Sequence, residues 1–176
     1  SPLRVIFEGR DRSATVVVTN QSDEAATYRI EWQEKIATPD GQYLDVRDPT
    51  PEMRISSPHI RFSPRQVTLA PGEQQQVRLA LRRPADLPAG EYRSHLAFVV
   101  IDERQRRAAR QNSSGGAGIQ VFMNLGFAIP IIVRHGEGRP GVSLSGVELS
   151  VDELNRLGLK VQLKQEGSFS TYGRLR

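Results

Sequence analysis

Cysteine is absent from this chain of 176 residues. Its absence excludes disulfide bonds, thiolate metal sites and a cysteine nucleophile. Aromatic residues are scarce, at 6% of the sequence, which leaves little material for a surface that stacks nucleic-acid bases. No apolar run approaches the roughly 20 residues of a membrane-spanning helix, so we expect no membrane insertion. A basic start followed by an apolar stretch is also missing, so we expect any signal peptide to have been removed already.

Lysine is the next scarce residue, because 21 arginines and only three lysines make up the 24 basic side chains. The formal net charge is +4. The arginines are scattered among 20 acidic residues instead of forming one stripe, and their densest group, in residues 104–110, lies in a polar segment typical of a loop. We therefore expect a solvated loop there and no nucleic-acid partner.

Hydrophobic residues at 38% and charged residues at 25% are typical of a folded domain. Most segments of the chain alternate apolar and polar residues, as half-buried strands do; one example is Tyr28, Ile30 and Trp32. Turn signals such as Pro71-Gly72 separate these segments. The pattern predicts an all-β fold, an immunoglobulin-like antiparallel β-sandwich with its tryptophan on the third strand.

The most regular alternation runs through residues 119–131, where every odd position is apolar. These positions are Ile119, Val121, Met123, Leu125, Phe127, Ile129 and Ile131. Pro130 has no N–H to give to a neighbouring strand, which favours an edge position in the sheet. A long apolar edge invites pairing with another chain. Residues 102–118, which precede this strand, are rich in arginine, serine and glycine and predict a flexible loop.

Glycine and proline interrupt the pattern after the strand, at residues 136–141. We predict a first domain over residues 1–135, a linker over residues 136–141 and a partial second β domain over residues 142–176. About 35 residues are too few for an independent β-domain. The last segment is therefore expected to hold the first strands of a second, incomplete β-sandwich.

No catalytic group can be assembled from the sequence. His59, His95 and His135 lie in different elements without metal-ligand spacing. No Gly-x-Ser-x-Gly motif is present, and neither glycine-rich segment is followed by the Lys-Ser/Thr of a phosphate loop. We expect a protein that is not an enzyme and that needs no metal or other cofactor.

Four segments, taken in order, resemble the PapD-like periplasmic chaperones of the chaperone–usher pilus pathway. They are residues 3–7 (LRVIF), 13–20 (SATVVVTN), 28–32 (YRIEW) and 62–79, which contain a proline-glycine turn followed by QQVR. The resemblance covers residues 1 to about 135 well and the remainder in outline. It implies two immunoglobulin-like domains and a periplasmic protein that binds pilin-type subunits and delivers them to an outer-membrane usher.

The resemblance also implies a binding site, because such chaperones lend an edge strand to a subunit that lacks one. The lent residues here would be Ile119, Val121, Met123, Leu125 and Phe127. An arginine and a lysine of the family grip the subunit's terminal carboxylate. Arg4 matches that arginine, whereas Pro130 stands at the lysine position; Arg134 is a second candidate for this anchor.

Three alternatives stay open at this point. The apolar face of residues 119–131 also fits the domain's own core, and residues 127–133 can close that core while the preceding residues are lent. The chain also fits a structural immunoglobulin-like module of a larger secreted or surface protein. A third option is a sandwich that binds a polyanion through its arginines, in which case binding would fall steeply with added salt. A free edge would further allow a self-capping homodimer.

Overall fold

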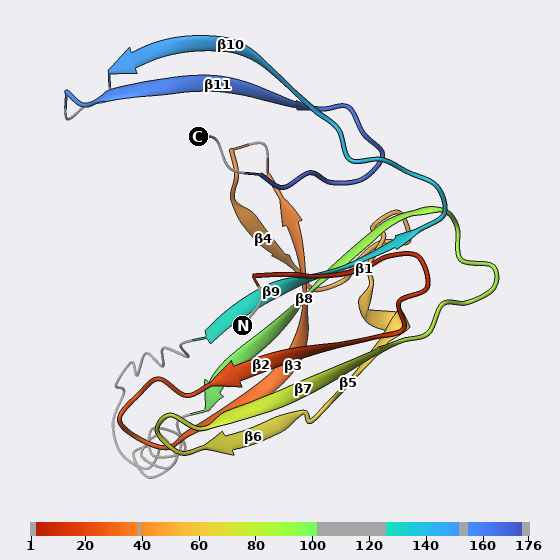
Figure 1. Ribbon diagram of the computed structural model, residues 1–176, viewed down its shortest axis with the longest axis vertical. Coiled ribbons are helices and arrows are strands. Elements are labelled where there is room, and N and C mark those ends of the chain that lie inside the picture. The colour runs from red at the N-terminus through yellow and green to blue at the C-terminus, as the bar shows by residue number, and fades with distance from the viewer. Residues whose placement is uncertain (1–2, 39, 102–125, 152–154, 174–176) are drawn as a thin grey trace, which may run out of the picture. The chain divides into compact units, whose positions relative to one another are not determined.

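The computed structural model of the protein describes residues 3–38, 40–101, 126–151 and 155–173 (Figure 1). The chain divides into two compact units. The first comprises Ser1–Ala85 and Tyr92–Val133, and the second comprises Asp86–Glu91 and Arg134–Arg176. In the described part of the chain, no helix has the length and apolar character needed to cross a membrane.

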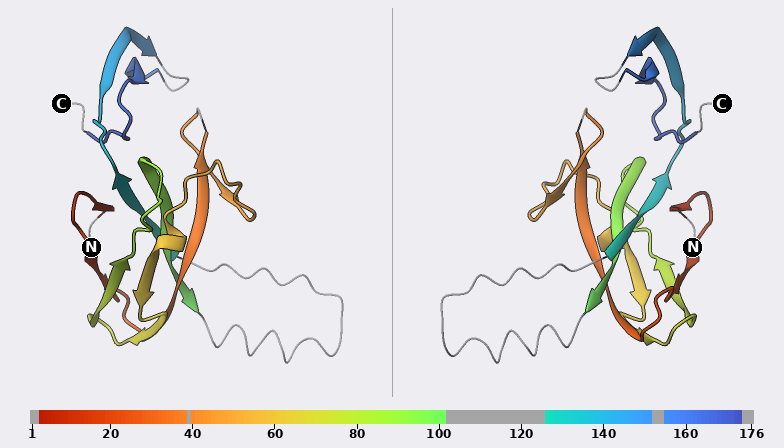
Figure 2. Two further views of the ribbon diagram at one scale, coloured as in Figure 1. Left: turned by 90° about the vertical axis from the view of Figure 1, so that its right-hand side faces the viewer. Right: turned by 90° about the vertical axis from the view of Figure 1, so that its left-hand side faces the viewer.

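The first unit is built from two sheets, seen as two layers in Figure 2. The larger sheet has the strand order β1-β9-β8-β3-β4, and β6 pairs with β3 beside this path. Its strands are β1 (Val5–Phe7), β3 (Ala26–Ala37), β4 (Tyr43–Val46), β6 (Gln66–Leu69), β8 (Gly90–Ile101) and β9 (Gly126–His135). The smaller sheet has the order β2-β7-β5, with β2 (Ser13–Thr19), β5 (Ile60–Ser63) and β7 (Gln74–Leu81). A short 3-10 helix, η1 (Ser57–His59), precedes β5.

Alternating apolar residues put the core between these sheets, because successive side chains of a strand point to opposite faces. Val77 and Leu79 of β7 and Leu96 and Phe98 of β8 are almost completely buried. Trp32 of β3 meets Phe62 of β5 edge to face at 5.5 Å between ring centres, which joins the larger sheet to the smaller one. The architecture confirms the predicted immunoglobulin-like β-sandwich.

A buried polar group fixes the connection between β4 and β5 to the larger sheet. The hydroxyl of Ser94 accepts hydrogen bonds from the backbone N–H groups of Ser56 and Ser57, at 3.0 and 2.9 Å. The Ser56 hydroxyl donates to the carbonyl oxygen of Ile131 at 2.9 Å. These bonds satisfy polar groups that burial would otherwise make costly.

The second unit contains an antiparallel hairpin of β10 (Val142–Val151) and β11 (Leu157–Gln165). A register shift between Ser145 and Glu148 keeps the apolar residues of both strands on one face. This hairpin face is formed by Val142, Leu144, Leu149, Val151, Leu157, Leu159, Val161 and Leu163. The other face carries serine, glutamate, lysine and glutamine side chains. The strands are therefore strongly amphipathic, as expected for a half-buried sheet.

One sequence prediction about β9 is wrong in part. Ile131, Ile132 and Val133 pair with β1, while β8 lies on the other side of the same strand. These three residues therefore lie inside the sheet and not at its edge. β1 is short and its pairing ends at Ile131, so it leaves residues 126–130 without a β1 partner.

Candidate subunit-binding edge

β9 changes its surroundings along its length. Its C-terminal half closes the core of the first unit, where Ile129, Ile131 and Val133 are buried. Residues 126–130 have β8 on one side, and among the described residues no strand is paired with them on the other. The strand therefore enters the sheet with one side open and becomes fully paired at Ile131.

Gly126 fixes how closely the open half of β9 lies on β8. A Cβ atom at this position would lie 2.7 Å from the carbonyl oxygen of Phe98 and 3.3 Å from the Cα atom of Val99. Such an approach leaves no room for a side chain without a shift of the backbone. Phe127 follows at once, 43% exposed, and its ring stacks on that of Phe98 with 4.8 Å between ring centres.

Phe127 is the one predicted lent residue that the structure describes. Ile119, Val121, Met123 and Leu125 lie outside the described residues. The partly exposed ring of Phe127 lies where the open half of the strand begins, so an apolar surface is present at the predicted end of the lent segment.

Arg4 directly precedes β1 and is partly buried. β1 runs parallel to β9 with Val5 opposite Ile131. Continuing this register by one residue puts Arg4 beside Pro130, the two positions that the family resemblance assigns to the cationic anchor. The pairing of strands thus brings together two positions that are 126 residues apart in the sequence.

Arg134, the second anchor candidate, is held in a polar cluster of the second unit. Its Nε atom donates to a carboxylate oxygen of Glu91 at 3.1 Å, and the guanidinium also donates to the carbonyl oxygen of Ser170 at 2.7 Å. The same Glu91 oxygen accepts from the Ser170 N–H, and the Arg134 guanidinium lies over the ring of Phe169 at 5.1 Å. The side chains of Arg134 and Glu91 are only 13% and 12% exposed. This cluster was not predicted, because Glu91 and Ser170 are far from Arg134 in the sequence.

The structure also shows where the histidines singled out in the sequence lie. The described residues contain no group of three or more histidine, cysteine, aspartate or glutamate side chains that can hold a metal ion. His95 is buried on β8, and its pKa is lowered to about 4, mainly by burial and further by the positive charges of Lys35 and Arg93, while Asp45 opposes the shift. Burial also lowers the pKa of His59. Both rings are therefore neutral at pH 7, and they lie in different elements.

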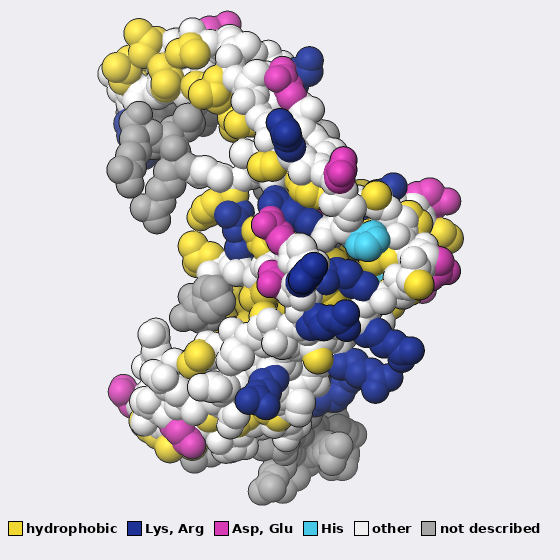
Figure 3. Space-filling model, turned by 45° about the vertical axis from the view of Figure 1, so that its right-hand side comes forward, with side chains coloured by type: hydrophobic (Ala, Val, Ile, Leu, Met, Phe, Trp, Pro, Cys, Tyr) yellow, Lys and Arg dark blue, Asp and Glu magenta, His cyan; other side chains and the backbone are white. Residues whose placement is uncertain are grey.

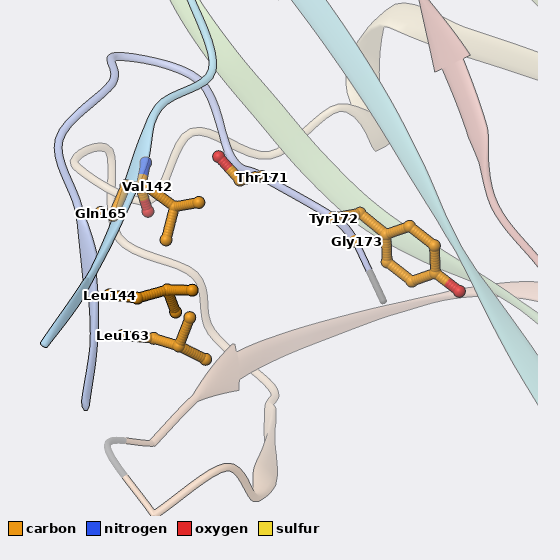
Figure 4. Close-up of a pocket in the computed structure, with 7 residues that line it drawn as sticks. All are labelled: Val142, Leu144, Leu163, Gln165, Thr171, Tyr172 and Gly173. Atoms are coloured by element: carbon orange, nitrogen blue, oxygen red, sulfur yellow. The ribbon is translucent and has the colours of Figure 1, made fainter. Parts of the chain in front are cut away.

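The second unit contains a hollow of about 680 Å³ beside the hairpin face (Figure 4). Val142, Leu144 and Leu163 line it from the hairpin, together with Gln165 and the segment from Thr171 to Gly173. Its lining is mostly apolar, and in Figure 4 the three hairpin side chains extend to the same side of the hairpin. Such a lining is typical of a surface against which further apolar side chains pack, and not of a site that binds a polar ligand.

No protein-family model matches the sequence, and no curated protein is similar to it. Solved structures do match the fold. The chain matches the class 5 fimbriae chaperone CfaA with a TM-score of 0.52 and 16% identity, over 95% of this chain and 65% of that one. It also matches a chain of the CsuC–CsuE complex, a chaperone–tip adhesion subunit pre-assembly complex from the archaic chaperone–usher Csu pili of Acinetobacter baumannii. This match has a TM-score of 0.50 and 15% identity and covers 96% of this chain and 76% of that one.

A third match is the CupB2 chaperone of Pseudomonas aeruginosa, with a TM-score of 0.50 and 16% identity over 92% of this chain and 83% of that one. The chain thus spans about 65% of the length of CfaA and more of the other two. At identities of 15–16% these matches establish the fold. The chain has the PapD-like β-sandwich fold of the fimbrial chaperones.

Proposed function

We propose that this protein is a periplasmic chaperone that binds pilin-type subunits and stabilises them by lending residues 119–127 as an edge strand. The observation that carries the proposal is the course of β9. Its C-terminal half is anchored between β1 and β8, whereas its N-terminal half enters the sheet with one side unpaired among the described residues. A strand held firmly at one end can present its other end to a subunit groove by β-augmentation.

The fold and the apolar sequence both support this function. Proteins of the same fold include the CfaA chaperone and a chaperone–tip adhesion subunit complex. The odd residues from Ile119 to Phe127 are all apolar, and burial of each such side chain stabilises a complex by roughly 1.5–3 kcal/mol before ordering costs. Four or five of them are sufficient to hold an incomplete subunit. Delivery of that subunit to an outer-membrane usher is part of the same proposal.

Glutamates on the apolar face of the lent strand test this mechanism. We expect the double variant Val121→Glu, Met123→Glu to lose capture of a co-expressed pilin-type subunit, because two carboxylates would have to be buried in its groove. The measurement is co-purification from the periplasm followed by mass spectrometry of the bound protein.

The matched control places the same two charges on the other face of the strand, as Gln120→Glu, Asn124→Glu. Because strand side chains alternate between faces, this variant is expected to keep subunit capture. Equal capture by both variants, or equal loss in both, would exclude lending of the odd positions.

We assign the carboxylate anchor to Arg4, because the pairing of β1 with β9 brings it beside Pro130, the second anchor position that the family resemblance implies. Arg4→Ala is expected to weaken subunit binding about tenfold or more, since a charge-assisted hydrogen bond contributes roughly 1.5–3 kcal/mol. Arg4→Lys should retain part of the affinity. An independent test is the affinity of a subunit that lacks its terminal carboxylate. This subunit cannot use the anchor, so it should bind the native chain and the Arg4→Ala variant with equal affinity.

A chaperone without a subunit can also cover its edge with a second copy of itself, which is the predicted self-capping homodimer. Sedimentation of the chain alone and with subunit tests this state. We expect dimers to dissociate as subunit is added, because both partners would use the same strand. Dimers that persist in the presence of saturating subunit would show that a different surface forms them.

A further inference from the structure

The smaller sheet of the first unit carries a group of arginines on its outer face. Arg61 of β5 and Arg78 of β7 are exposed, and Arg82 directly follows β7 with an exposed side chain. We call these three residues the sheet-face arginines. Figure 3 shows one face of the molecule on which lysine and arginine side chains gather, with few acidic side chains among them.

Strand register brings the sheet-face arginines close together. Arg61 is directly opposite Ala80, so Arg78 and Arg82 are both its diagonal neighbours on the same face; diagonal neighbours lie roughly 7 Å apart. Three positive charges therefore share one face of two adjacent strands.

These charges are not neutralised within the part of the chain that the structure describes. None of the sheet-face arginines forms an ion pair with a described residue. The strands β2, β5 and β7 contain no aspartate or glutamate. Asp11 and Glu73 flank the sheet, and neither carboxylate forms an ion pair with a sheet-face arginine. Like charges at this spacing repel one another, and an external anion would relieve that repulsion.

The residues between the arginines indicate the kind of anion. The exposed neighbours on this face are small or polar: Ser13, Thr15, Ser63, Gln76 and Ala80. The face lacks the aromatic and methionine side chains that form the centre of most protein interfaces, and it has no aromatic ring on which a nucleic-acid base can stack. Guanidinium groups, by contrast, bind phosphate oxygens through two parallel hydrogen bonds.

We propose that the sheet-face arginines bind the phosphate-rich surface of an anionic phospholipid bilayer, peripherally and without insertion. The contact is electrostatic, because the only apolar side chain larger than alanine on the described β2, β5 and β7 positions of this face is Val17, which is partly buried. The bilayer surface offers phosphates at many positions, so several arginines can engage together. The site is separate from β9 and independent of the proposed chaperone function.

Vesicle co-sedimentation tests the proposal with the full chain. We expect binding to vesicles of phosphatidylglycerol and phosphatidylcholine, loss of that binding when salt is raised severalfold, and no binding to phosphatidylcholine alone. The double variant Arg61→Gln, Arg78→Gln should weaken the partition about 25-fold, since each arginine near an anionic surface contributes a factor of about five. Circular dichroism of the variant checks that the fold is kept.

The matched control removes two exposed arginines elsewhere, as Arg47→Gln, Arg139→Gln, with the same change in net charge. Its partition should fall by less than about fivefold. Equal losses in the two variants would show that binding depends on net charge and not on the position of the arginines, which would overturn the proposal. Absence of binding to phosphatidylglycerol vesicles would overturn it as well. Binding of duplex DNA or of a polyglutamate peptide as tight as that of vesicles, lost in the Arg61→Gln, Arg78→Gln variant, would assign the face to another polyanion.

Discussion

His95 is a residue whose surroundings make the fold sensitive to pH. It is 5% exposed, and its ring meets that of Tyr43 edge to face at 5.4 Å. Its Nδ1 atom has no hydrogen-bond partner among the residues that the structure describes. Burial, with Lys35 and Arg93 nearby, lowers its pKa to about 4. A histidine in the unfolded chain has a pKa near 6.5. The unfolded state therefore binds a proton more readily than the folded state between these two values.

Stability is accordingly expected to fall as pH decreases below about 6.5 and to level off, for this residue, below about 4. His95 alone should lower the free energy of unfolding by about 2 kcal/mol between pH 7 and pH 5. Urea unfolding at both pH values, compared with His95→Gln, gives the measurement. The pKa of His59 is lowered as well. The contribution of His95 is therefore read as the difference between the native chain and His95→Gln in how much the free energy of unfolding changes from pH 7 to pH 5. The same pH dependence in both would contradict a role for His95.

Asn20 forms one hydrogen bond that its residue type predicts and a second that the local sequence does not predict. Residues 20–23 are Asn-Gln-Ser-Asp, a composition typical of a turn, in which an asparagine side chain bonds nearby backbone groups. Its oxygen accepts from the Ser22 N–H at 3.1 Å, as that reasoning implies. Its nitrogen, however, also donates to the carbonyl oxygen of Leu69 at 3.0 Å, and the residue is fully buried. That second bond depends on a residue 49 positions away, which local sequence does not specify.

Among the elements, strands that bury one face were predicted best. β7 alternates buried and exposed residues along most of its length, and this was visible in the sequence because the period of a strand is two. In β9 the same rule fails locally. Ile132 was expected to point away from the core, yet Ile131, Ile132 and Val133 are all buried. At these residues β9 lies inside the sheet, between β1 and β8. Both faces of the sheet are covered there, and the alternation of residues in the sequence cannot reveal that the face opposite the core is covered too.

The connection between β4 and β5 was a further gap in the sequence prediction. Residues 47–58 contain three prolines, which favour an extended connection but give no indication of its depth. In the structure Ser56 is completely buried, and Ser94 of β8 accepts two backbone hydrogen bonds from this segment. The role of Ser94 depends on a partner 38 residues away, so it could only be found in three dimensions.

For the candidate site, the sequence contributed the residues and the fold contributed their placement. The alternation of residues 119–131 predicted an apolar strand, and the structure describes the part from Gly126 onward. The adjacency of Arg4 and Pro130 follows from the parallel pairing of β1 with β9. By contrast, the pairing of Arg134 with Glu91 had no signal in the sequence, since charged residues on different strands have many possible partners.

At the scale of the whole molecule, the hairpin of β10 and β11 is the feature that most needs an explanation. Seven of its leucine and valine side chains on the hairpin face are between 45% and 74% exposed. Figure 3 shows hydrophobic side chains gathered on this hairpin. A two-stranded sheet is marginally stable alone, and large exposed apolar patches mark surfaces that bind something. We propose that residues 142–176 are the first part of a second β-sandwich, whose further strands would cover this face.

Serine substitutions on the hairpin face distinguish a covered surface from an open one. In the 176-residue chain, Leu159→Ser, Leu163→Ser should change the free energy of unfolding by about 1 kcal/mol or less, because both side chains are more than 60% exposed. Leu79→Ala in the core of the first unit should cost about 2–5 kcal/mol and serves as the buried reference. The double serine variant should also bind less of a hydrophobic fluorescent dye, because less apolar surface would remain exposed. If its stability loss instead matches that of Leu79→Ala, the hairpin face is already buried in this chain, and no further strands are needed to cover it.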